Sequence, residues 1–219
     1  MPALLQVWFE KLLEIIFPKE ILIAKLEELA KKEGLGSLPL ADEPPATFIN
    51  PLFNYQDHRI RTLVWAIKYR GNKFLAGEAG KLLYEAIVED LGETVFFENS
   101  RKVVIVPVPL SRKRFLERGF NQTELLCAGI VLADSNKIFS YKADILIKTL
   151  GTPPQTSLRR SERLKNLSGC FEIKKPEAVR DKFVILIDDV STTGSTLREA
   201  RKTLLAAGAK KVLAFVIAH

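Results

Sequence analysis

One segment near the end of the chain constrains its fold more than any other. Residues 184–196 read VILIDDVSTTGST. The apolar run at the start of this segment predicts a buried parallel strand, since such a strand is covered on both faces. Two aspartates and a loop of small, hydroxyl-bearing residues follow, and residues 197–207 have the pattern of a helix. A strand, a tight loop and a helix in this order predict an α/β fold.

The loop and the aspartates suit two parts of one ligand. Backbone N–H groups at the start of a helix, together with the helix dipole, favour a phosphate group. Asp188 and Asp189 would repel a phosphate, but carboxylates accept hydrogen bonds from the vicinal hydroxyls of a ribose. The combination predicts a ribose 5-phosphate site. The residues predicted to bind the 5-phosphate are Thr192, Thr193, Gly194, Ser195 and Thr196. The alternative is a strand–helix turn of another α/β protein, in which Ser and Thr cap the helix.

Residues 184–196 resemble the signature of the type I phosphoribosyltransferases, which bind phosphoribosyl pyrophosphate (PRPP). The Asp pair, the glycine and the final threonine all match. The resemblance implies a type I phosphoribosyltransferase-like parallel sheet flanked by helices, with PRPP and Mg²⁺ as ligands. Mg²⁺ keeps most of its waters and prefers substrate phosphates, so we expect no dedicated protein cage for the ion. Asp188 and Asp189 would share it with PRPP.

The rest of the chain supports a parallel sheet. Apolar strand patterns at residues 103–106 and 212–217 alternate with helical patterns. Such alternation implies right-handed crossovers and a ligand beyond the carboxyl ends of the strands. The helical patterns cover residues 59–69, 75–91 and 122–133, and shorter strand-like runs cover residues 144–150 and 169–173.

The first fifty residues predict a separate helical element. Residues 4–17 and 21–32 have apolar stripes at helical spacing, and residues 36–51 contain four prolines. The stripe is too apolar to face water, so we expect it to pack on the main domain or on a second copy in a homodimer. A helix at a membrane interface is the alternative, which its glutamates oppose. The predicted division is a helical N-terminal extension (1–38), a Pro-rich linker (39–51) and a phosphoribosyltransferase-like domain (52–219).

Composition narrows the classes of partner. Lys and Arg exceed Asp and Glu by 33 − 26 = 7, which favours phosphorylated small molecules or nucleic acid. The isolated Cys127 and Cys170 predict core positions and neither a zinc ribbon nor a disulfide framework. The apolar stretches fall short of the ~20 residues that span a bilayer, and the N-terminus lacks the basic start of a secretory signal. We expect a cytoplasmic protein without membrane insertion.

Three basic segments are candidates for the pyrophosphate side of the site. The stretch after the strand at 103–106 has cationic groups that suit a pyrophosphate, although a solvated basic turn fits it as well. Residues 151–166 predict a mobile loop that closes and excludes water, or else an ordinary basic loop. The third segment, residues 68–71, ends a predicted helix, where basic residues also serve as caps. The candidates are Lys68, Arg70, Pro109, Ser111, Arg118, Asn121, Gln122, Gln155 and Arg159, with Arg163 as a catalytic candidate beside Asp188 and Asp189.

The order of these blocks resembles the ComF family of competence-related proteins over residues 52–219. The block Arg-Gly-Phe-Asn-Gln at 118–122 and the segment Lys-Tyr-Arg-Gly at 68–71 carry this resemblance beside the signature. It implies a role linked, in some bacteria, to imported single-stranded DNA. The chain departs from the family in having no cysteine zinc ribbon at its start. It also has Thr192 where nucleobase-salvaging relatives often carry an acidic residue, which argues against ordinary purine salvage.

Two hypotheses follow. In the first, the protein transfers a phosphoribosyl group from PRPP to an unknown acceptor and releases pyrophosphate. In the second, it is a non-catalytic component of the transformation machinery that binds PRPP or single-stranded DNA, with cations and exposed aromatic rings as the nucleic-acid contacts.

Overall fold

The computed structural model describes residues 19–42, 44–97, 103–149 and 169–219. The helical pattern predicted over residues 4–17 and the basic loop predicted over residues 151–166 lie outside the described residues. In the described part of the chain, no helix is both long and apolar enough to cross a membrane.

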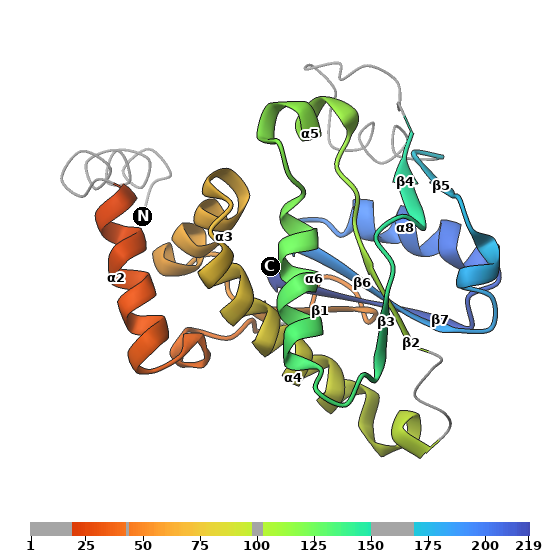
Figure 1. The fold of residues 1–219 in the computed structure, drawn as a ribbon, viewed down its shortest axis with the longest axis horizontal. Coiled ribbons are helices and arrows are strands. Elements are labelled where there is room, and N and C mark those ends of the chain that lie inside the picture. Colours follow the sequence, from red (N-terminus) through yellow and green to blue (C-terminus); the bar gives the residue numbers. More distant parts are fainter. Residues whose placement is uncertain (1–18, 43, 98–102, 150–168) are drawn as a thin grey trace.

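A five-stranded parallel sheet forms the centre of the molecule (Figure 1). The strand order is β1-β7-β6-β2-β3, and every neighbouring pair is parallel. The strands are β1 (Ile49–Phe53), β2 (Val103–Pro107), β3 (Phe139–Tyr141), β6 (Phe183–Val190) and β7 (Lys211–Ala218). The predicted α/β class and its parallel sheet are therefore confirmed.

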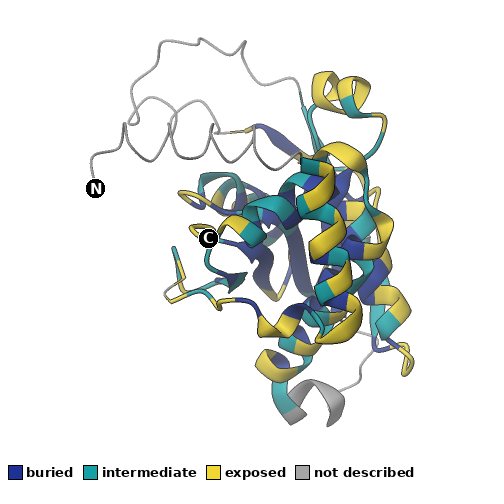
Figure 2. Cartoon of the chain, turned by 90° about the vertical axis from the view of Figure 1, so that its left-hand side faces the viewer, coloured by how far each residue is buried: buried dark blue, intermediate teal, exposed yellow. Residues whose placement is uncertain are grey.

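Helices cover both faces of this sheet, which is why its central strands are apolar throughout. One buried cluster joins alternate strand residues such as Ile185 and Ile187 to α3, α4 and α6. The other joins Val184 and Leu186 to α8. Figure 2 shows the buried residues gathered in the strands and on the inner sides of the helices. These helices are α3 (His58–Arg70), α4 (Lys73–Phe97), α6 (Gln122–Ala133) and α8 (Ser195–Ala206). The backbone of α4 breaks at Gly92, just beyond the predicted helix at 75–91.

The N-terminal helix α2 (Lys19–Lys32) packs against α3 and α4, with Leu26 and Ala30 buried in the same core. This agrees with the helical pattern at 21–32. Four short elements lie outside the central sheet: the 3-10 helices η1 (Leu35–Ser37) and η3 (Pro176–Ala178), and the antiparallel strands β4 (Leu146–Lys148) and β5 (Phe171–Ile173).

Three elements differ from the sequence-based expectation. Strand β1 begins at Ile49, inside the stretch predicted as a linker, and pairs with β7. It tolerates Pro51 because it is an edge strand, whose outer side needs no N–H donor. Strand β3 is only three residues long and was not predicted. The basic stretch after β2 is a helix, α5 (Arg112–Arg118), and not a turn. The division into extension, linker and domain stays a prediction.

Candidate functional site

The carboxyl ends of three neighbouring strands meet at one edge of the sheet. The N–H of Val108, just past β2, donates to Ile187 O of β6 at 2.9 Å. The N–H of Ser191, just past β6, donates to Ala218 O of β7 at 3.0 Å. The C-terminus marked in Figure 1 lies at this edge, beside α3. The segments that leave these strands therefore face a common region, where ligands of parallel α/β sheets bind.

The predicted phosphate loop lies at the start of α8. Gly194 has φ of 70°, a left-handed conformation that favours glycine. A Cβ at this position would lie 2.8 Å from Ile49 Cδ1, so the loop packs tightly on β1. The hydroxyl of Thr193 lies 3.0 Å from Ser195 Oγ and accepts the Ser195 N–H at 3.4 Å. Hydroxyls and backbone N–H groups thus gather at the N-terminus of a twelve-residue helix, which is favourable for an anion.

Asp188 and Asp189 end β6 beside this loop. Asp188 Oδ1 accepts the Asp189 N–H at 2.8 Å, and Asp189 Oδ1 accepts the Val190 N–H at 2.9 Å. Asp189 is only 5% exposed. Its second oxygen, Oδ2, accepts no hydrogen bond of normal geometry from the described residues.

The electrostatics of this pair favour a positive partner. Burial raises the pKa of Asp188 well above its ordinary value, and the negative charge of Asp189 raises it further. Lys68 opposes this effect, because its Nζ lies 3.1 Å from Asp189 Oδ2. One lysine amine lies beside two adjacent carboxylates. The pair therefore retains an unbalanced negative charge, and a further cation or a hydroxyl donor would stabilise it.

Lys68 reaches this position from the last turn of α3. Gly71 ends the helix in a left-handed conformation, φ 59°, and its N–H donates to Ala66 O, so glycine forms the helix cap. Lys68 itself is directed to the Asp pair. Arg70, two residues further, is not: it pairs with Glu20 of α2, and its guanidinium lies 5.5 Å from the centre of the Trp65 ring.

The Arg-Gly-Phe-Asn-Gln block connects the end of β2 to the end of α3. Asn121 caps α6, and its Nδ2 donates to Val108 O at 3.3 Å. Arg118 donates to Gln122 Oε1 at 2.8 Å and lies 5.2 Å above the Tyr69 ring. The Phe120 ring lies against Gly71, where a Cβ would approach its Cζ to 3.1 Å. In this arrangement the polar groups of Asn121 and Gln122 are buried and already have partners.

The other candidates have separate positions. Ser111 caps α5 by accepting the Arg114 N–H at 3.4 Å, and Pro109 is half-buried in the turn between β2 and α5. Gln155, Arg159 and Arg163 lie outside the described residues. The structure therefore brings together Lys68, the Asp pair and the phosphate loop, with the block at 118–122 as their support.

Two residues at this edge were missed from the sequence. Arg198 donates from Nη1 to Thr193 O at 2.5 Å and from Nη2 to Pro45 O at 3.3 Å. Arg198 could have been identified from the sequence, because it lies four residues after Gly194 and hence on the same side of the helix. His219 lies with Nδ1 2.6 Å from Ser191 O. A carbonyl only accepts, so Nδ1 carries the proton. No sequence pattern indicated this long-range contact.

A model of the phosphoribosyl transferase domain matches residues 122–219, from α6 to the end of the sheet. The matched segment contains the Asp pair and the phosphate loop, so this part of the chain is similar to the phosphoribosyl transferase domain. The named relatives of the chain include DNA utilization and competence proteins, which agrees with its resemblance to the ComF family.

These relatives match about half of the chain. The DNA utilization protein YhgH of Escherichia coli is 36% identical over 109 residues, which cover 49% of this chain and 45% of the relative. The competence protein ComFC of Bacillus subtilis is 36% identical over 105 residues, covering 48% and 39%. ComFC of Streptococcus pneumoniae is 41% identical over 110 residues, covering 50% and 45%. The chain thus spans less than half the length of each of these three relatives.

Solved structures are similar over larger shares of the chain but at low identity. The allosteric regulatory enzyme of purine biosynthesis has a TM-score of 0.41 and 17% identity, covering 70% of this chain and 30% of the enzyme. A hypoxanthine phosphoribosyltransferase from Staphylococcus aureus has a TM-score of 0.34 and 15% identity, covering 64% and 62%.

Proposed function

We propose that this protein binds PRPP with Mg²⁺ and transfers its phosphoribosyl group to an acceptor, with release of pyrophosphate. The observation that supports the proposal best is the convergence at the carboxyl end of β6. There a carboxylate pair with Asp189 buried and Asp188 half-buried, an amine from α3 and a helix N-terminus lined with hydroxyls face one region. These groups match the ribose hydroxyls, the pyrophosphate and the 5-phosphate of one ligand.

In the proposed complex, each part of PRPP has its own partners. The loop from Thr192 to Thr196 binds the 5-phosphate through backbone N–H groups and hydroxyls. The carboxylates of Asp188 and Asp189 accept hydrogen bonds from the two ribose hydroxyls and fix the orientation of the ring. Lys68 lies on the α3 side of the pair, where its positive charge attracts the negatively charged pyrophosphate. Arg159 and Arg163 are proposed to add positive charge to the same group.

The residues present fit a magnesium ion shared with substrate. Asp189 Oδ2 has the Lys68 amine as its ion-pair partner but no hydrogen bond of normal geometry, and the pKa of Asp188 is raised; both observations indicate a site that a further cation would stabilise. The described residues contain no group of three His, Cys, Asp or Glu side chains that would hold a metal by themselves. Asp188 and Asp189 would therefore hold the ion together with phosphate oxygens. When bound, Mg²⁺ neutralises charge on the pyrophosphate.

The transfer breaks one bond and forms another at C1 of the ribose. The C1–O bond to pyrophosphate breaks, its electron pair leaves with the pyrophosphate, and C1 gains positive character. The nucleophile of the acceptor forms the new bond to C1 and loses its proton. Lys68 stabilises the charge that develops on the leaving group, while the Asp pair holds the ring in place. Thr192 cannot act as a base near neutral pH, so we propose an acceptor other than an ordinary purine.

Calorimetry and a turnover screen test this proposal. We expect PRPP and ribose 5-phosphate to bind the full chain in the presence of Mg²⁺, and radiolabelled PRPP to lose pyrophosphate with one of a panel of amines, bases and nucleic acids. The double variant Asp188→Asn plus Asp189→Asn is the control and should bind inorganic phosphate but not PRPP. A wild-type protein that binds neither PRPP nor ribose 5-phosphate would refute the proposal.

The second candidate is a binding protein without turnover. Phe115 is 46% exposed and Tyr69 is 55% exposed, and both lie beside arginines. Such rings can stack on the bases of single-stranded DNA while the cations hold its backbone. Several relatives are named for DNA utilization or competence. DNA binding that weakens steeply with salt, together with PRPP binding and no pyrophosphate release, would favour this candidate. A cytoplasmic location and a homodimer through the N-terminal extension stay predictions.

A further inference from the structure

One residue joins three helices next to Lys68. Asn72 follows the cap of α3, and its N–H donates to Ala66 O at 3.2 Å, which closes the last turn of that helix. Its Oδ1 accepts the Leu75 N–H at 3.0 Å and so caps α4. Its Nδ2 donates to Glu27 Oε1 of α2 at 2.7 Å. The turn that contains Lys68 thus ends at a side chain held by α2.

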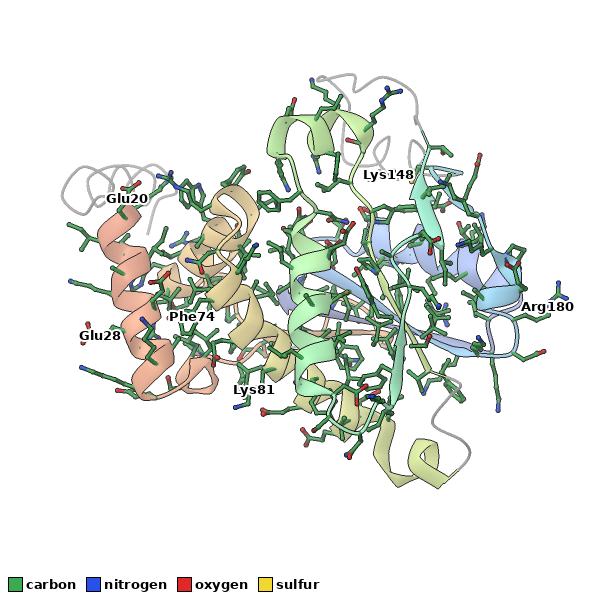
Figure 3. All side chains as sticks on the ribbon, in the orientation of Figure 1. Glu20, Glu28, Phe74, Lys81, Lys148 and Arg180 are labelled. Carbon is green, nitrogen blue, oxygen red and sulfur yellow. The ribbon has the colours of Figure 1, made fainter. Side chains whose placement is uncertain are left out.

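Glu27 and its neighbour Glu28 differ in what they contact. Glu27 is half-buried and faces Asn72, across 45 residues of sequence. Glu28 is exposed and pairs with Lys32 on its own helix, at 2.7 Å. Figure 3 shows Glu28 on the side of α2 away from α3. Glu27 and Glu28 are adjacent and have the same charge, but only Glu27 contacts the corner between α3 and α4. Comparing substitutions at the two positions therefore distinguishes the loss of this contact from the general effect of removing an acidic residue from α2.

The same corner is held on its opposite side by the block at 118–122. Phe120 packs on Gly71, and Arg118 lies over Tyr69. Other α2 contacts flank the link to Asn72, since Lys31 lies 5.3 Å from the centre of the Phe74 ring. The last turn of α3 is therefore fixed between α2 and the α5–α6 connection, and Lys68 leaves this turn toward Asp189.

We propose that Glu27 of α2, acting through Asn72, is a positioning residue for Lys68 on the pyrophosphate side of the site. The inference rests on the proposed function, because it assigns Lys68 to the pyrophosphate of PRPP. A lysine side chain is long and flexible, so its charge is placed by the backbone from which it extends and by its partner. The Glu27–Asn72 link fixes that backbone, and Asp189 fixes the amine.

This role predicts an effect that depends on the ligand. Lys68 lies beside the Asp pair and not in the phosphate loop of α8, so loosening its turn affects the pyrophosphate and spares the 5-phosphate. General destabilisation of the protein would weaken both ligands alike. The ratio of PRPP affinity to ribose 5-phosphate affinity is therefore the quantity that distinguishes positioning from a structural role.

The test compares Glu27→Ala with Glu28→Ala by calorimetry of PRPP and ribose 5-phosphate in Mg²⁺. We expect Glu27→Ala to weaken PRPP binding by about three- to tenfold and to leave ribose 5-phosphate binding within a factor of about two. Glu28→Ala should leave both unchanged. Glu27→Gln keeps an oxygen that accepts from Asn72, so it should bind PRPP as the wild type does.

A double-mutant cycle checks that the effect passes through Lys68. In a Lys68→Gln background, Glu27→Ala should cause no further loss of PRPP affinity. An additive loss, or an equal loss for both ligands, would overturn the proposal. So would an unchanged PRPP affinity in Glu27→Ala.

Hydrogen exchange keeps the inference testable even if PRPP is not the ligand. The amides of Gly71 and Asn72 both donate to Ala66 O, and their protection should fall in Glu27→Ala and not in Glu28→Ala. Unchanged protection would refute the positioning role by itself. Lower protection in a protein whose wild type binds no PRPP would refute only the proposed ligand.

Discussion

On one side of the candidate site, a continuous stretch of chain supplies every group. Strand β6 ends in Asp188 and Asp189, the loop follows at once, and α8 begins at Ser195. The contacts that shape the loop join residues two to five positions apart, such as Thr193 with Ser195 and Thr193 with Arg198. Its geometry is mostly local, and the contact of Gly194 with Ile49 adds support from β1.

On the other side, the single amine of Lys68 depends on contacts between distant parts of the chain. Lys68 comes from α3 and meets Asp189 of β6. Its turn is held by Glu27 of α2 and by Phe120 between α5 and α6. The difference indicates that the 5-phosphate side should tolerate changes elsewhere in the molecule, whereas the pyrophosphate side should respond to changes far from the ligand. Four predictions test this contrast.

The largest effect is expected where the two sides meet. Asp188→Asn plus Asp189→Asn removes both carboxylates that would bind the ribose hydroxyls and the cation. We expect PRPP affinity in Mg²⁺ to fall by about a hundredfold or more, because hydrogen bonds to charged groups are worth ~1.5–3 kcal/mol each. Inorganic phosphate, which needs only the loop, should bind as before. Calorimetry with both ligands decides the matter: if the double variant binds PRPP normally, the carboxylates are structural.

The next largest effect is expected from one of two basic residues in the same helical turn. Lys68→Gln should weaken PRPP and pyrophosphate binding by about tenfold, the value of one charge-assisted bond, and spare ribose 5-phosphate. Arg70→Gln makes the same charge change, yet it should alter neither ligand by more than about twofold. Arg70 pairs with Glu20 at the surface, where such pairs contribute little. Equal losses for the two variants would mean that only net charge matters and would remove the assignment of Lys68.

The contrast between the two sides also explains what the sequence could predict. The strand at 183–190, the phosphate loop and α8 follow from local patterns, namely an apolar run, small hydroxyl residues and an amphipathic helix. The same holds for α6, whose predicted and observed bounds at 122–133 agree. Strands β1 and β3 were missed because their pairing with β7 and β2 supplies what their short, irregular sequences lack.

The partners of the basic residues were not predictable for a similar reason. Lys68 and Arg70 look alike in sequence, and only the fold shows that one meets Asp189 and the other Glu20. Asn121 reads as a ligand-binding amide, but in the structure it caps α6 and donates to Val108 O. Periodicity identifies elements and motifs, whereas the partner of a long polar side chain depends on tertiary packing.

A moderate effect is expected from Gly194→Ala. The added Cβ would meet Ile49 Cδ1 at 2.8 Å, and φ of 70° is unfavourable for alanine. We expect a loss of stability of ~1–2 kcal/mol and a fall of about fivefold in affinity for both ribose 5-phosphate and PRPP. Adding Ile49→Val removes the overlapping methyl group and should recover part of the affinity. Thermal melts and calorimetry measure the two quantities, and a variant with full affinity would show that the loop does not hold the phosphate.

The smallest effect is expected from Arg198→Gln. The guanidinium joins Thr193 O to Pro45 O and so ties the phosphate loop to the chain that enters β1. Because the loop is also shaped by its own hydrogen bonds and by the start of α8, losing this tie should weaken ribose 5-phosphate and PRPP by only about threefold each, the lower range of a single hydrogen bond. Lys202→Gln, which removes an exposed charge from the same helix, is the matched control and should have no effect. Arg198→Lys keeps the charge but lacks the planar fork that spans the two carbonyls, so it should behave as Arg198→Gln does. If the lysine variant instead binds as the wild type, Arg198 acts on the phosphate by charge alone, and the loop on this side of the site is even more self-contained than its contacts suggest.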